Sequence, residues 1–285
     1  MRYALVNNER VEASHGLSAL CPGCGQPMVA KCGDRRVHHW AHRGRRTCDH
    51  WWEPETRWHR QWKSRFPAGW REFVHVAADG ERHIADVRTG HGLVLEFQHS
   101  HLRPDERAAR EAFYPNLIWV VDGTRLKRDA PRFAAGGQML RPTPWRGIYT
   151  VAFPEECFPP NWLDCRAPAF FDFAGAGPVA PGAMPVERYL WGPLPGRAEG
   201  HGVVVALGRE TLVRAARERP QILDAVGIVG FLQARFRAER VAAMQEGHRL
   251  PSGKPSKRRR VWMRLQVPTS PMPQTANMAP RPRIS

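Results

Sequence analysis

Two carboxylates interrupt runs of residues that otherwise have the pattern of β-strands. Asp86 lies in the run HIADV and Glu96 in the run LVLEFQ, where an uncompensated charge is costly. Neighbouring strands lie about 4.8 Å apart, so the two side chains are placed to hold one divalent cation between them. Mg²⁺ or Mn²⁺ takes such oxygen ligands and keeps several waters, one of which can attack a phosphodiester.

Other polar side chains are spaced to assist this chemistry. Gln98 follows Glu96 by two residues, so both point to the same face of a strand, where Gln98 could orient the water or the phosphate. Glu55, His59 and Lys63 recur every four residues and share one face of a predicted helix. Glu55 is a further candidate metal ligand, His59 a proton-transfer group, and Lys63 a cation against the charge of the transition state. The alternative is an ordinary solvated helix face.

A second cluster has the composition of a zinc site. Cys21-Pro-Gly-Cys24 forms a short knuckle, and His39-Trp-Ala-His42 follows with the same two-residue gap. Four N and S ligands suit tetrahedral Zn²⁺, and the intervening residues favour a small hairpin around Gly33-Asp34. Without a metal, these would be reduced thiols beside unrelated surface histidines. Four nearby residues are competing ligands: Cys32, His38, Cys48 and His50.

The elements that must position these residues follow one another between residues 51 and 125. A helix is predicted over about 54–66, where Trp58, Trp62 and Phe66 form an aromatic edge. Asp79-Gly80 is a strong hairpin signal. The predicted order is a helix, three strands, a helix and a strand, carried by EPETRWHRQWKSRF, REFVHVAA, RHIADVR, LVLEFQ, PDERAAREAFY and NLIWVVD. This alternation is typical of an α/β (α+β) domain.

The charge of the chain favours a polyanionic partner. The 285 residues carry a formal charge of +16, which makes nucleic acid the leading candidate. About half of this charge lies in residues 246–285, which are rich in proline and predict a disordered basic tail. No stretch is apolar enough for a membrane span or a secretory signal, so we expect a cytoplasmic protein. The candidate nucleic-acid contacts of the tail are Lys254, Lys257, Arg258, Arg259, Arg260 and Arg264.

The motifs between about residues 15 and 125 together resemble the competence protein CoiA-like family. They are CPGC, HHWAH, E-x3-H-x3-K, the Ala-Asp pair, EFQHS and IWVVDG. That family is similar to the PD-(D/E)XK nucleases, and the resemblance implies a restriction-endonuclease-like mixed central sheet flanked by helices, preceded by a small zinc-binding module. By position, Asp86 and Glu96 match the two acidic residues. Gln98 stands where lysine is usual, and Ala85 where proline is. Either Lys63 supplies the positive charge instead, or the activity is weakened.

These observations divide the chain into four parts and predict its function. We expect a zinc-knuckle module at 1–50, a nuclease-like core at 51–125, a Pro/Gly-rich region with C-terminal helices of unknown role at 126–247, and a basic tail at 248–285. The leading hypothesis is a metal-dependent nuclease that processes DNA during uptake or recombination, with recombination or DNA-processing proteins as partners. The alternatives are a non-catalytic DNA-binding accessory factor on a degenerate nuclease fold and an RNA-binding zinc protein.

Overall fold

A computed structural model describes residues 1–44, 49–51, 53–174 and 188–249 of the chain. The chain divides into two compact units, residues 1–237 and 238–285. All the elements discussed below belong to the first unit, apart from the end of the last helix. The six basic residues predicted to contact nucleic acid through the tail lie outside the described residues, as does Cys48.

The N-terminal residues form a five-stranded antiparallel sheet in the order β2-β1-β3-β4-β5. Its small core contains Ala4, Met28 and Trp40 together with Cys21. The hairpin predicted around Gly33-Asp34 joins β4 to β5, with Lys31 opposite His39. The strands are β1 Tyr3–Val6, β2 Glu9–Glu12, β3 Ser18–Leu20, β4 Pro27–Lys31 and β5 His39–His42.

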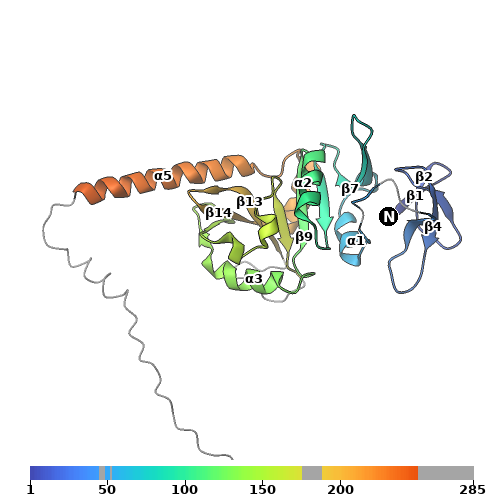
Figure 1. Cartoon of the computed structure of the whole chain (residues 1–285), viewed down its shortest axis with the longest axis horizontal. Helices are drawn as coiled ribbons and strands as arrows, with labels where there is room; N and C mark the ends of the chain where they lie inside the picture. The colour runs from blue at the N-terminus through green and yellow to red at the C-terminus, as the bar shows by residue number, and fades with distance from the viewer. Residues whose placement is uncertain (45–48, 52, 175–187, 250–285) are drawn as a thin grey trace, which may run out of the picture. The chain divides into compact units, whose positions relative to one another are not determined.

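A mixed nine-stranded sheet forms the centre of the first unit (Figure 1). Its first part has the predicted order: helix α1 (Arg57–Lys63), three antiparallel strands, helix α2 (Pro104–Phe113) and strand β9 (Leu117–Asp122), which pairs in parallel with β8. The turn at Asp79-Gly80 joins the first two strands, and Gly80 takes the left-handed conformation, with φ of 90°. These strands are β6 Arg71–Val76, β7 Arg82–Arg88 and β8 Val94–Gln98.

The same sheet continues beyond residue 125, where the sequence suggested a separate region of unknown role. The complete order is β10-β11-β14-β13-β12-β9-β8-β7-β6, and β12 pairs in parallel with β9. Strands β10 to β14 therefore build the half of the sheet next to the half that carries the predicted catalytic residues. The additional strands are β10 Arg141–Pro142, β11 Ile148–Val151, β12 Ala169–Asp172, β13 Tyr189–Ala198 and β14 His201–Gly208.

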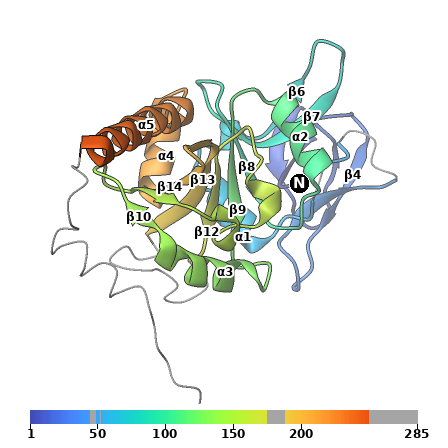
Figure 2. The same cartoon turned by 60° about the vertical axis from the view of Figure 1, so that its left-hand side comes forward.

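Helices cover both faces of the sheet (Figure 2). On one face α3 contributes Phe133 to a core with Trp119 and Phe171. On the other face Trp62 of α1 and Leu212 of α4 pack with Phe97 of β8. The remaining helices are α3 Asp129–Gly136, α4 Arg209–Glu218 and α5 Ala225–Arg249, with short 3₁₀ turns at Ala68–Trp70, Gly137–Met139, Pro154–Glu156 and Pro160–Trp162. No helix in the described ranges combines the length and the apolar character needed to cross a membrane.

Helix α1 is shorter than predicted, because Thr56 caps it. The Thr56 hydroxyl accepts the backbone N–H of His59, and the His59 ring in turn accepts the backbone N–H of Thr56. This reciprocal capping fixes the helix start at Arg57. Glu55 consequently precedes the helix, rather than occupying its first turn as the four-residue spacing suggested.

Candidate metal-dependent catalytic site

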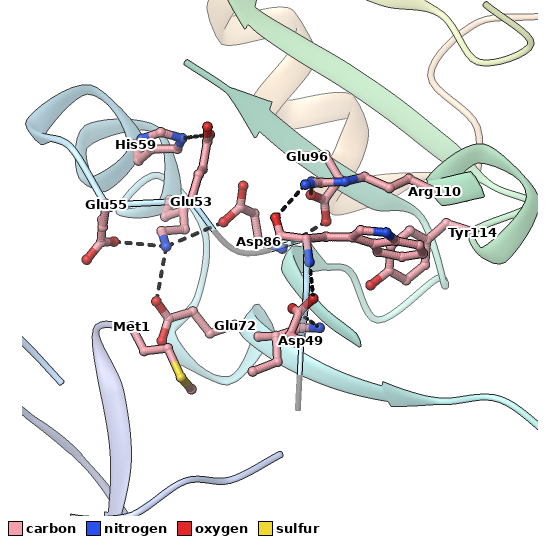
Figure 3. Close-up of a pocket in the computed structure, with 13 residues that line it drawn as sticks. Met1, Asp49, Glu53, Glu55, His59, Glu72, Asp86, Glu96, Arg110 and Tyr114 are labelled. Carbon is pink, nitrogen blue, oxygen red and sulfur yellow. Dashed lines mark hydrogen bonds and ion pairs between the residues drawn. The ribbon is translucent and has the colours of Figure 1, made fainter. Parts of the chain in front are cut away.

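The carboxylates Glu55, Glu72 and Asp86 line the candidate site (Figure 3), and Lys63 pairs with all three. Its Nζ lies 2.8 Å from Glu55 Oε1, 3.1 Å from Glu72 Oε1 and 3.5 Å from Asp86 Oδ1, and the side chain is buried. Burial alone would lower the pKa of the amine. The negative charges of Glu72, Asp86 and Glu55 raise it by more than burial lowers it, so the net shift of the pKa is upward. Lys63 is therefore a permanent cation in this pocket.

Asp86 and Glu96 lie next to each other on β7 and β8. The backbone N–H of Asp86 donates to Glu96 Oε1 at 3.2 Å, and the backbone N–H of Phe97 donates to Asp86 Oδ2 at 3.0 Å. Burial, reinforced by the charge of Asp86, raises the pKa of Glu96 to about 8, although Arg110 opposes this. A cation bound between the two side chains would favour the ionised form of Glu96.

Arg110 of α2 forms an ion pair with Glu96. Its guanidinium lies 3.1 Å from Glu96 Oε2 and 2.6 Å from Glu106 Oε1, and it also donates to the carbonyl of Trp51. The arginines near the site in sequence have other partners. Arg82 donates to the carbonyl of Gly23, Arg88 lies over the Phe73 ring, and Arg107 pairs with Glu111. None of these three interactions involves Asp86 or Glu96.

His59 and Glu53 form a pair at the edge of the site. His59 Nε2 lies 2.6 Å from Glu53 Oε1, while Nδ1 accepts the Thr56 N–H. The proton of the neutral ring therefore lies on Nε2 and points to Glu53. Burial raises the pKa of Glu53, but the contact with His59 outweighs it and the pKa falls to about 2. The His59 ring is thus held in a fixed orientation between Thr56 and an ionised carboxylate.

Gln98 lies outside the pocket that the other predicted residues line. Its amide Nε2 donates to Glu53 Oε2 at 3.2 Å and to the carbonyl of Ser100 at 3.1 Å. The backbone N–H groups of His99 and Ser100 also donate to Glu53. In the structure Gln98 therefore helps to position Glu53, whereas the sequence suggested that it orients a water or a phosphate.

Glu72 connects the site to the N-terminal sheet. It is buried in β6 with φ of 47°, a conformation that is unfavourable for a residue with a side chain. Its carboxylate accepts the backbone N–H of Arg2, at 2.7 and 2.9 Å from its two oxygens, and the N–H of Tyr3 at 2.9 Å. Burial opposes ionisation of Glu72, yet Lys63 and these donors lower its pKa to about 2. The strained backbone is compensated by this network of charged hydrogen bonds.

These side chains enclose a pocket of about 60 Å³. About 10–15 Å³ of such volume is enough to hold one water, so the pocket has room for a small ion and a few waters, but it is far below the roughly 300 Å³ of pockets that hold small organic ligands. Its donor set is rich in carboxylate oxygen, which fits Mg²⁺ or Mn²⁺. Asp86 and Glu96 are the residues that would hold such an ion. Both oxygens of Glu55 face cations, Oε1 toward Lys63 and Oε2 toward Arg60, so Glu55 is poorly placed as a third ligand.

The N-terminal sheet contains a potential zinc site made of Cys21, Cys24 and His42, whose ligand atoms lie within 4.8 Å of one another. Cys24 Sγ lies 3.4 Å from His42 Nε2. Tetrahedral Zn²⁺ with its usual bond lengths separates such atoms by about 3.5 Å. The knuckle is closed by hydrogen bonds from Gly25 N–H to the Cys21 carbonyl and from Cys21 N–H to the Gln26 carbonyl. The residues therefore fit the metal that the sequence predicted.

The structure does not bring His39 to this group, contrary to our expectation. Residues 39–42 form strand β5, and side chains three residues apart on a strand point to opposite faces. His39 Nδ1 instead lies 2.9 Å from the carbonyl of Val37. Among the competing candidates in the described ranges, Cys32, His38 and His50 are also absent from the group. The spacing of His39 and His42 therefore does not give a shared ligand role, because both residues lie on one strand.

Sequence reasoning missed several residues of the pocket. Glu53 and Asp49 stand in irregular segments, Glu72 lies in β6, and Arg110 is a buried residue of α2. Only the fold brings these residues to the pocket. Glu72 had the clearest signal that could have been used, because it is a charged residue at the start of the strand-like run REFVHV.

Taken together, the chain is an α+β protein with a mixed sheet flanked by helices and a small N-terminal sheet that carries a Cys₂His group. Residues 6–50 match the family model described as Competence protein CoiA, N-terminal domain, and this match supports a CoiA-like family for the chain. Comparisons with curated proteins and with solved structures gave no match.

Proposed function

We propose that this protein is a metal-dependent nuclease that hydrolyses phosphodiester bonds in DNA. The match to the CoiA N-terminal domain supports a competence-associated function, which would place the reaction in the cytoplasm during DNA uptake or recombination. The observation that carries the catalytic proposal is the convergence of Asp86, Glu96 and Lys63 on one pocket, from two adjacent strands and a helix. The mixed sheet flanked by helices supports it as well, because this is the fold that the resemblance to PD-(D/E)XK nucleases implies.

The proposed reaction assigns separate tasks to the residues of the pocket. Asp86 and Glu96 hold a divalent cation, which supplies a bound water of lowered pKa near the phosphate. Lys63, held by Glu55 and Glu72, faces the developing negative charge of the transition state. His59 is oriented by Glu53 and can exchange a proton with the reacting oxygen atoms. The pocket is too small for a nucleotide, so the DNA strand lies outside it and presents only its phosphate.

Cleavage of DNA by the purified full-length chain tests this proposal. Asp86→Asn and Glu96→Gln keep the size of the side chain but remove the charge that binds the cation, so each should abolish cleavage in Mg²⁺ or Mn²⁺ while DNA affinity stays nearly intact. Gln61→Asn is a suitable control, because Gln61 is an exposed residue of α1 that does not line the pocket. Equal residual cleavage by the wild type and the Asp86→Asn, Glu96→Gln double variant would refute the nuclease proposal.

One observation favours a second function, a non-catalytic DNA-binding accessory factor. Lys63 already neutralises Asp86, and Arg110 already pairs with Glu96, so the pocket is electrostatically satisfied to a large extent without a metal. A protein of this kind would bind DNA but would not bind Mg²⁺ at the pocket. Titration of the zinc-loaded protein with Mn²⁺, followed by electron paramagnetic resonance, distinguishes the two functions, because only the nuclease loses a Mn²⁺ site in Glu96→Gln.

A further inference from the structure

A second pocket lies where the hairpin loop between β4 and β5 meets the start of α1. We call it the β4–β5 groove. Its volume is about 390 Å³, within the range of pockets that bind small ligands and several times that of the carboxylate pocket. It is lined by Arg35, Arg36, Val37, His39, Pro54, Glu55, Thr56 and Arg57.

The groove is positively charged. Arg35, Arg36 and Arg57 are exposed, and within the described residues no salt bridge to an acidic side chain is formed by any of them. Glu55 is the single acidic residue of the lining, and Arg60 and Lys63 already neutralise it. Three guanidinium groups without acidic partners, on the walls of one concave surface, are suited to phosphate, because the planar fork of arginine matches phosphate oxygens.

The loop that forms one wall of the groove is anchored to the other wall. Arg60 of α1 donates to the carbonyl of His38 at 2.5 Å and to Glu55 Oε2 at 2.9 Å. The ring of His39 is fixed by the carbonyl of Val37. These hydrogen bonds fix the shape of the groove where the N-terminal sheet contacts α1. His39, which does not join the metal group, is one of the residues that line it.

Glu55 lines both the groove and the carboxylate pocket. A strand whose scissile phosphate meets Lys63 must pass outside the small pocket, and the groove opens at its edge with room for about one nucleotide. We infer that the β4–β5 groove binds the backbone phosphates of a DNA strand through Arg35, Arg36 and Arg57. This inference rests on the proposed function for its ligand, and it assigns the N-terminal sheet a direct part in holding the substrate.

The test is the salt dependence of DNA binding by the full-length, zinc-loaded chain. A fluorescent single-stranded oligonucleotide is titrated with protein at several salt concentrations without added Mg²⁺ or Mn²⁺. Each lost phosphate contact lowers the slope of log K against log salt by about 0.7 on a single strand. The Arg35→Ala, Arg36→Ala, Arg57→Ala variant should therefore lose about 2 from the slope, and the corresponding lysine variant should keep most of it, because the charges remain.

The matched control is Arg128→Ala, Arg141→Ala, Arg146→Ala. These arginines are also exposed, and Arg141 lies in β10, at the opposite edge of the nine-stranded sheet from β6. An unchanged slope in the groove variant, or an equal loss in the control, would overturn the inference, as would a loss seen with an RNA oligonucleotide but not with DNA. Circular dichroism of each variant shows whether it is folded.

The same measurement separates this inference from the nuclease proposal. Binding is measured without the catalytic cation, so a protein that binds DNA through the groove but never cleaves it would retain the slope difference. A nuclease that holds its substrate elsewhere would cleave DNA at the wild-type rate in the groove variant and would show no change of slope.

Discussion

Glu96 should make the metal-free protein less stable as the pH rises. Its pKa is about 8 in the folded chain, against an ordinary value of 4.5, because the carboxyl is buried beside Asp86. Between these two values the folded state holds a proton that the unfolded state has released, so the unfolding free energy falls with increasing pH. The stability contributed by this proton is fully present below about pH 4.5 and is lost as the pH rises through about 8.

The expected size of the effect follows from the same two values. One pKa unit corresponds to about 1.4 kcal/mol, so the difference between 4.5 and about 8 corresponds to a loss of up to about 5 kcal/mol. Glu96→Gln cannot ionise and should not lose this stability. A divalent cation that binds between Asp86 and Glu96 favours the ionised form, so Mg²⁺ should stabilise the wild type more at pH 8.5 than at pH 6.

Urea unfolding of zinc-loaded wild type and Glu96→Gln, measured from pH 6 to pH 9 with and without Mg²⁺, checks this prediction. Over this range, which covers the two pH units from 6 to about 8, the metal-free wild type should lose about 3 kcal/mol relative to Glu96→Gln. The two proteins differ only at position 96, so the difference between the two curves isolates Glu96. Parallel curves would refute the reasoning about Glu96, and equal stabilisation of both proteins by Mg²⁺ would show that the ion binds elsewhere.

Three further predictions follow from the same structure. Cys24→Ser and His42→Ala should reduce the zinc content measured by elemental analysis, whereas His39→Ala should leave it unchanged. Loss of zinc from all three variants would show that His39 is a ligand after all. Lys63→Ala should slow DNA cleavage more than Gln98→Ala, because only Lys63 lies in the pocket; the reverse order in single-turnover kinetics would contradict its proposed role. Truncation after residue 250 should lower the salt slope for duplex DNA by up to about 5, and an unchanged slope would mean that the tail does not contact DNA.

The sequence predicted the part of the fold that depends on local patterns. The turn at Asp79-Gly80 and the alternating residues around it define β6 and β7, and the same alternation places Asp86 beside Glu96. Strand β13 was not predicted because its sequence contains Pro193 and Pro195, and proline is unusual inside strands. The register of β13 shifts between Pro193 and Arg197, so the strand accommodates this stretch through an irregularity that no periodicity reveals.

The candidate site was predictable only where its residues lie on regular elements. Asp86, Glu96 and Lys63 follow strand and helix periods, whereas Glu72 reaches the site through a strained backbone and a hydrogen-bond network with residues about 70 positions away in the chain. His39 and His42 show the opposite case, since their spacing favoured a shared ligand role that the direction of strand side chains prevents. Long-range contacts and local backbone conformation decided these outcomes.

The contact between Glu72 and β1 has a consequence for how the sequence can diverge. Glu72 recognises Arg2 and Tyr3 through their backbone N–H groups, which any residue except proline provides. The side chains at positions 2 and 3 can therefore change during evolution without loss of this contact, while position 72 must keep a carboxylate of suitable length. In related chains we therefore expect an invariant glutamate, while position 3 is limited by its own burial and by its hydroxyl, which accepts from Arg71, and not by Glu72.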